Sequence, residues 1–121
     1  MIATTQRTLH NGARNAVIQC TGVSDGSGNE DHVLKVDVSA LGASAVAVRK
    51  IGYDVAGGLV KLSWDDLTPV DFAMLSNQGE MDYSHIGGMQ NGGSTGDILL
   101  STAGFGLNSS YTVTFELVKK G

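Results

Sequence analysis

The stretch from Tyr111 to Lys120 constrains the fold more than any other part of the chain. Its side chains alternate strictly between an apolar face and a largely polar face, with Tyr111, Val113, Phe115 and Leu117 opposite Thr112, Thr114, Glu116 and Val118. This period of two is typical of a half-buried strand, and neither Pro nor Gly interrupts it. Because such a strand cannot bury its apolar face alone, the rest of the chain must supply further strands.

Shorter segments of the same kind recur along the whole sequence. The predicted strands cover residues 14–21, 33–38, 46–53, 59–64, a run that begins at Val70, 81–83, 98–102 and 111–120. Turn residues separate them about every ten residues, as in antiparallel sandwiches and barrels. No window of twelve or more residues keeps a helical apolar period, although residues 40–48 could hold one short turn. We therefore expect an all-β protein, an antiparallel β-sandwich of jelly-roll-like form.

The alternation within these segments also predicts which side chains form the core. The expected core residues are Leu34, Val36, Ile51, Leu62, Trp64, Phe72, Ile98, Leu100, Val113, Phe115 and Leu117. In the run that begins at Val70, the face carrying Val70, Phe72 and Met74 is expected to be the apolar one.

Length and charge restrict the classes of protein to which the chain can belong. Its 121 residues suit one domain, residues 1–121, in which residues 1–7 form either an edge strand or an arm that orders against a neighbour. A net charge of −4 with few adjacent basic residues argues against a nucleic-acid partner. No segment approaches the ~18 consecutive apolar residues of a membrane helix, and the start of the chain lacks a signal peptide. We expect a soluble protein made in the cytosol, without a membrane partner.

The residue types that carry chemistry are scattered. Cys20 is the single cysteine, so no disulfide is expected, and its position beside Ile18 in a strand is typical of a buried, inert thiol. His10, His32 and His85 lie in separate segments without the spacing of metal ligands, and we expect them to be exposed turn residues.

Four short segments carry polar residues of the kinds found in binding sites. Asp25–Asp31 has oxygen side chains at alternate positions but lacks the Gly and the closing Glu of a calcium loop, which leaves either a looser cation site or a solvated connection. Gly87–Gly96 lacks the Lys-Ser/Thr ending of a phosphate loop. Asp65-Asp66 fits an ordinary turn before Pro69, and Asn108-Ser109-Ser110 is a sequon that a cytosolic product would not use. The sequence thus predicts no catalytic, cofactor-binding or metal-binding residue, and no enzyme.

Four segments carry a resemblance to a known class of protein. They are Gln6–Asn15, Thr21–Gly28, Lys35–Leu41 and Thr95–Thr102, in this order along the chain. Together they resemble small virion proteins of tailed bacteriophages, of the kind that decorate or cement the capsid. Such head-decorating proteins share all-β modules with head-tail joining and tail proteins.

The resemblance implies a non-enzymatic protein that binds the outside of a phage head and bridges major capsid proteins after synthesis in the host cytoplasm. A head-tail joining or tail structural protein is the first alternative, and a ligand-binding or hydrolytic β domain is the second. Similar decorating proteins often form trimers at symmetry axes of the shell. We accordingly expect a homotrimer, with Met1–Arg7 and Gly87–Gly96 among its contacts.

Overall fold

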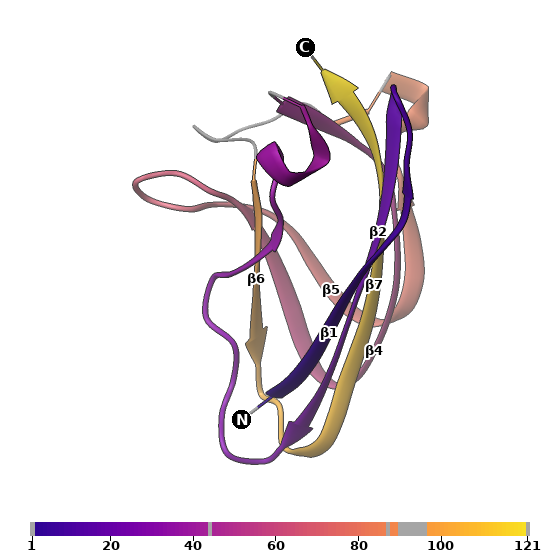
Figure 1. The fold of residues 1–121 in the computed structure, drawn as a ribbon. Helices are drawn as coiled ribbons and strands as arrows, with labels where there is room; N and C mark the ends of the chain where they lie inside the picture. The colour runs from indigo at the N-terminus through magenta and orange to yellow at the C-terminus, as the bar shows by residue number, and fades with distance from the viewer. Residues whose placement is uncertain (1, 44, 87, 90–96, 121) are drawn as a thin grey trace.

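The computed structural model describes residues 2–43, 45–86, 88–89 and 97–120, which form one strongly curved antiparallel sheet (Figure 1). The strands are β1 (Ile2–Asn11), β2 (Asn15–Asp25), β3 (Val33–Val36), β4 (Ala45–Trp64), β5 (Val70–Asp82), β6 (Ile98–Ala103) and β7 (Leu107–Lys120). Within this part of the chain, the helical structure is limited to two 3₁₀ turns, η1 (Ser39–Leu41) and η2 (Ser84–Ile86). The prediction of an antiparallel all-β protein is confirmed.

The strands follow the order β1-β2-β7-β4-β6-β3, and β5 pairs with β4 outside this path. The first half of β4 pairs with β7 and its second half with β6, so the sheet turns over where β4 bends. Figure 1 shows the result, with β6 lying across the core from β2 and β7. The two ends of the path approach each other, because the side-chain amide of Gln6 in β1 donates a hydrogen bond to the backbone oxygen of Lys35 in β3. The sheet is therefore nearly closed.

The bend in β4 lies at Gly57 and Gly58. We predicted separate strands on either side of these glycines, whereas one strand of 20 residues runs through them. Gly57 has a φ of 85°, which other residues rarely adopt, and a Cβ on Gly58 would lie 2.3 Å from a ring carbon of Phe105. The glycines thus let the backbone bend and approach Phe105 without ending the strand.

A similar correction applies to β5. A separate short strand is predicted at 81–83, but β5 continues without a break to Asp82 and accommodates Asn77 at a φ of 60°. The eight or nine predicted strands therefore become the seven that the described residues form.

The core lies inside the curved sheet and contains most of the predicted residues. Nine of the eleven are buried, namely Val36, Ile51, Leu62, Trp64, Ile98, Leu100, Val113, Phe115 and Leu117. Phe72 is half-buried and stacks on Trp64, with 4.7 Å between ring centroids. Leu34 was wrongly assigned, since 45% of it is exposed.

The two residues that depart from the expected core, Leu34 and Phe72, lie in strands whose pairing is irregular. In β3, the register with β6 shifts between Leu34 and Val36, so Lys35 turns inward in place of Leu34. In β5, the register shifts opposite Leu62 and Ser63, so the buried residues are Ala73 and Leu75. The predicted face of Val70 and Met74 is exposed, which reverses our assignment for this strand.

The N-terminal segment forms β1, the edge-strand alternative for residues 1–7. β1 pairs with β2 along its length, and residues 12–14 connect the two strands. The backbone N–H of Gly12 donates to the oxygen of Asn15 at 2.8 Å.

Candidate functional site

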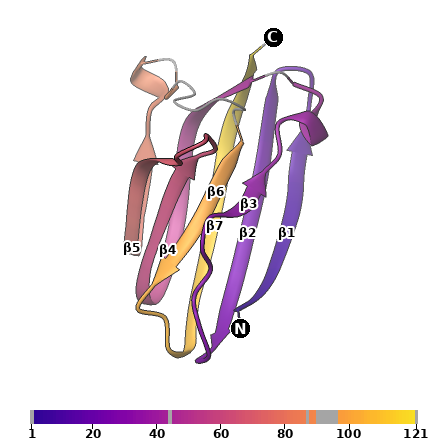
Figure 2. The same cartoon turned by 90° about the vertical axis from the view of Figure 1, so that its left-hand side faces the viewer.

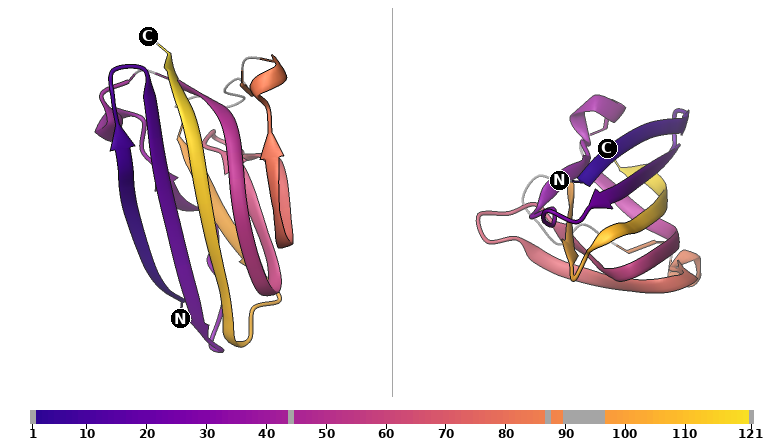
Figure 3. Two further views of the ribbon diagram at one scale, coloured as in Figure 1. Left: turned by 90° about the vertical axis from the view of Figure 1, so that its right-hand side faces the viewer. Right: turned by 90° about the horizontal axis from the view of Figure 1, so that it is seen from below.

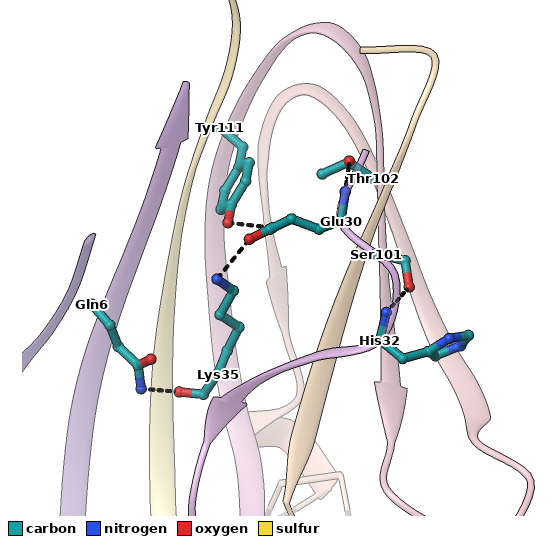
Figure 4. A network of polar contacts seen from close by, with 7 residues as sticks. All are labelled: Gln6, Glu30, His32, Lys35, Ser101, Thr102 and Tyr111. Carbon is teal, nitrogen blue, oxygen red and sulfur yellow. Dashed lines mark hydrogen bonds and ion pairs between the residues drawn. The ribbon is translucent and has the colours of Figure 1, made fainter. Parts of the chain in front are cut away.

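An ion pair between Lys35 and Glu30 is buried inside the curved sheet (Figure 4). The Nζ atom of Lys35 lies 3.0 Å from Oε1 of Glu30, and the two side chains are only 4% and 8% exposed. The hydroxyl of Tyr111 in β7 donates to Oε2 of the same carboxylate at 2.7 Å. Both carboxylate oxygens therefore have donors, which offsets the large cost of burying the charges.

Backbone hydrogen bonds hold this cluster in place. The N–H of Glu30 donates to Oγ1 of Thr102 at 2.8 Å, and the N–H of Thr102 donates to the oxygen of Glu30 at 3.0 Å. These bonds fix the loop before β3 against β6, while Gln6 binds the backbone of Lys35 from β1 (Figure 4). We call Glu30, Lys35 and Tyr111 the interior polar cluster; it connects β3 and its preceding loop to β7.

The environment of the cluster changes the acidity of two neighbouring groups. Burial raises the pKa of the Cys20 thiol from 9.0 to about 11, an effect that the nearby Lys35 ammonium group partly opposes. Burial also raises the pKa of Tyr111, and its hydrogen bond to Glu30 acts in the same direction. Both groups are therefore neutral at physiological pH, and Cys20 is the buried, free thiol that the sequence predicted.

Sequence reasoning missed the cluster because Lys35 appeared to lie on the polar face of its strand. The one available signal was Tyr111, because a tyrosine on an apolar face usually needs a hydrogen-bond partner for its hydroxyl. The pattern could not identify that partner as Glu30, which lies in the loop predicted to be either a looser cation site or a solvated connection.

A shallow concavity of about 280 Å³ lies on the outer side of the same loop. Asp31, His32, Lys61 and Ser101 contribute its polar groups, and the remaining lining residues are Asn29, Glu30, Thr102 and Ala103. Nδ1 of His32 lies 2.7 Å from Oδ1 of Asp31. Oγ of Ser101 accepts a hydrogen bond from the backbone N–H of His32, and the imidazole points away from it (Figure 4). Ser101 and the His32 ring are thus not arranged as a nucleophile and its base.

The other residues considered from the sequence remain dispersed. His10, His32 and His85 are exposed, as predicted. His32 lies in the loop before β3 and His85 in the short turn η2, but His10 lies in β1, so its assignment to a turn was wrong. Asp66 binds the backbone N–H of Leu67, as in an ordinary turn. In the part of the chain that the structure describes, no three His, Cys, Asp or Glu side chains group closely enough to hold a metal ion.

The two candidate loops have different outcomes. In the Asp25–Asp31 loop, Asp25 accepts two hydrogen bonds from Ser27, and Glu30 points into the interior polar cluster rather than toward a cation. Of the Gly87–Gly96 loop, only Gly88 and Met89 are described, and Met89 pairs with Val48 through two backbone hydrogen bonds. The rest of that loop lies outside the described residues.

Comparison with protein-family models and with curated proteins finds no match to this chain. Among the described residues, no helix is long and apolar enough to cross a membrane.

Proposed function

We propose that this chain is a non-enzymatic structural subunit of a tailed-bacteriophage virion, which binds the outside of the head and stabilises it by bridging major capsid proteins. The proposal rests on the resemblance carried by Gln6–Asn15, Thr21–Gly28, Lys35–Leu41 and Thr95–Thr102. An antiparallel all-β domain is compatible with it. The finer classification as a jelly-roll-like β-sandwich belongs to the same proposal.

One structural observation supports the non-enzymatic part of this proposal. Among the described residues, the ionisable groups of Glu30, Lys35 and Tyr111 converge inside the protein and bind one another. Polar groups so arranged fix the shape of a domain and offer a substrate no open group. A rigid body with long exposed strand edges at its surface suits a repeated subunit whose work is contact with neighbours.

The proposed partners are the major capsid protein and further copies of this chain, in a homotrimer on the capsid exterior. The subunit is synthesised in the host cytoplasm and uses no cofactor, nucleic acid or membrane. Met1–Arg7 and Gly87–Gly96 were our candidates for trimer contacts, and of these β1 includes residues 2–7.

Counting the protein in purified virions tests the proposal. Decoration of a symmetric shell requires hundreds of copies per particle, and the purified protein should bind again to heads from which it has been removed. A stoichiometry of a few copies would instead support the first alternative, a head-tail joining or tail protein.

The second alternative is a ligand-binding or hydrolytic β domain, which the concavity beside His32 and Lys61 would suit. His32→Ala and Lys61→Ala should leave binding to heads unchanged. Ligand binding or hydrolysis that the wild-type protein shows and that both variants lose, with the fold intact, would move the function to this concavity.

A further inference from the structure

β1 is unusually exposed for a ten-residue strand. Every residue from Thr4 to His10 is exposed, which includes side chains on both faces of the strand. Its attachment consists of the pairing with β2 and the hydrogen bond from Gln6 to Lys35. Because ordering a strand costs conformational entropy that burial normally offsets, a surface of this kind is better stabilised when a neighbour covers it.

A second free edge lies at the opposite end of the same layer. In the row β1-β2-β7-β4-β5, β1 and β5 are the outermost strands (Figures 2 and 3). Residues 76–80 of β5 are all exposed. Within the described chain, β1 has no backbone pairing beyond β2, and β5 has none beyond β4. β1 approaches β3 through the side chain of Gln6 but does not pair with its backbone. The backbone groups on both edges can therefore extend the sheet of another copy.

The charges on the two edges differ in sign. β1 carries Arg7 and His10 and no acidic residue, whereas the C-terminal half of β5 carries Glu80 and Asp82. Lys50 lies 3.7 Å from Glu80, but that carboxylate stays 56% exposed, and exposed pairs of this kind interact weakly. Hydrogen bonds from Ser84 lower the pKa of Asp82, so this residue is negative at neutral pH.

These charges distinguish between the ways in which two copies could meet. A two-fold pairing of β1 with β1 would bring arginines together, and a pairing of β5 with β5 would bring carboxylates together. A contact between β1 and β5 places opposite charges side by side, which favours it over both like-edge contacts.

We propose that copies of this chain associate head to tail, with the free edge of β1 in one copy against the free edge of β5 in the next. The four successive antiparallel pairings from β1 to β5 give these two strands the same direction. A symmetry axis along the strands therefore pairs them in parallel, and repetition of this heterologous contact closes a ring when the rotation from copy to copy divides a full turn. The contact joins copies of this chain, so it stands whether or not the protein binds a capsid.

Cross-linking of mixed variants tests the polarity of the contact. Thr5→Cys and Gln78→Cys place thiols on exposed residues of the two edges, and the native Cys20 is buried. Under mild oxidation, covalent dimers containing one copy of each variant should dominate in the mixture. Thr68→Cys, at the exposed turn between β4 and β5, serves as the control partner for Thr5→Cys and should form few dimers.

Dimers of Thr5→Cys alone that match the mixture in yield would show a two-fold β1 contact and overturn the proposal. Absence of cross-links in every combination, together with a monomer by sedimentation, would also overturn it.

Charge reversal supplies an independent test. Arg7→Glu or Glu80→Lys alone should raise the dissociation constant between copies by at least about tenfold, since each puts like charges together. The double variant exchanges the two charges and should recover most of the affinity. Additive weakening in the double variant would contradict the pairing of these two edges, and circular dichroism would confirm that each variant folds.

Discussion

At the scale of single residues, the buried ion pair of Lys35 and Glu30 distinguishes this interior from an ordinary apolar core. Both carboxylate oxygens of Glu30 have donors, from Lys35 and Tyr111. Among the described residues, every buried side-chain nitrogen and oxygen has a hydrogen-bond partner. A cluster satisfied in this way tolerates loss of one member poorly, because the remaining charge stays buried.

Lys35→Met should therefore lower the free energy of unfolding by about 3–5 kcal/mol, the cost typical of removing one partner of a buried pair. Adding Glu30→Leu should recover much of that loss, because no charge is then left without a partner. Urea denaturation measures both effects. Lys61→Met provides the matched control. Nζ of Lys61 lies 3.7 Å from Oδ2 of Asp71, and because both side chains are partly exposed, this pair should contribute less than about 1 kcal/mol. Equal losses for Lys35→Met and Lys61→Met would show that the interior cluster has no special role.

The thiol of Cys20 predicts how stability depends on alkaline pH. Its pKa in the folded chain is about 11, against 9.0 as the ordinary value. Above pH 9 the unfolded chain loses the proton while the folded chain keeps it, so stability is complete below pH 9 and falls toward pH 11. The loss amounts to about 2–3 kcal/mol, at 1.36 kcal/mol per pKa unit. Tyr111, whose pKa is also raised, adds to the fall at higher pH.

Denaturation of the wild type and of Cys20→Ala between pH 8 and 11 separates these contributions. The variant should be less stable at pH 8 because of its smaller side chain, yet its free energy of unfolding should fall much less than that of the wild type between pH 9 and 10. A parallel decline in both proteins would show that Cys20 is not the group responsible.

At the scale of the strands, the bend of β4 decides the shape of the sheet. Gly58 allows close approach of the Phe105 ring, which lies in the connection from β6 to β7. Because β4 bends at Gly57 and Gly58, its first half can pair with β7 and its second half with β6. The curvature of the sheet therefore depends on the absence of a side chain at Gly58, which leaves room for the Phe105 ring.

Gly58→Ala should destabilise the protein by about 1–3 kcal/mol, since its Cβ would lie 2.3 Å from Phe105 and 2.8 Å from the oxygen of Ala103. Gly52→Ala in the same strand is the control, because no atom lies within 4 Å of its added Cβ. Denaturation midpoints should separate the two variants clearly. Similar midpoints would mean that the bend does not depend on Gly58.

The strands themselves could be predicted from the sequence because each alternates over several residues, as β7 does. Their continuity could not, since glycines at Gly57-Gly58 are equally compatible with a turn and with a bend inside one strand. The prediction of which side chains face the core was wrong where a bulge inserts one extra residue into the pairing of two strands. A single bulge at Lys35 exchanges inside for outside, and alternation alone contains no sign of it.

For the candidate site, the sequence predicted whether single residues are buried or exposed but not which residues contact one another. The sequence correctly placed Cys20 in the interior and the three histidines at the surface. It did not bring Glu30, Lys35 and Tyr111 together, because their contact depends on a loop that folds inward and on strands distant in the sequence.

At the scale of the whole molecule, the proposed role is to add stability to a larger assembly. A subunit that bridges neighbouring capsid proteins binds the assembled shell and not its separated parts, so binding favours the assembled state. Each contact can be modest, because interfaces of ~1,600 Å² range from micromolar to picomolar affinity. Repetition over a symmetric shell multiplies the effect.

The most direct measurement of this claim is the temperature at which packaged DNA leaves the particle. Matched virions with and without the protein are heated with a DNA-binding dye, and the release temperature is read from fluorescence. Particles without the protein should assemble but release DNA at a lower temperature, and adding back the purified protein should restore the higher one. Identical release temperatures would contradict the role in stabilising the head, and particles unable to assemble without the protein would show that it helps to build the shell.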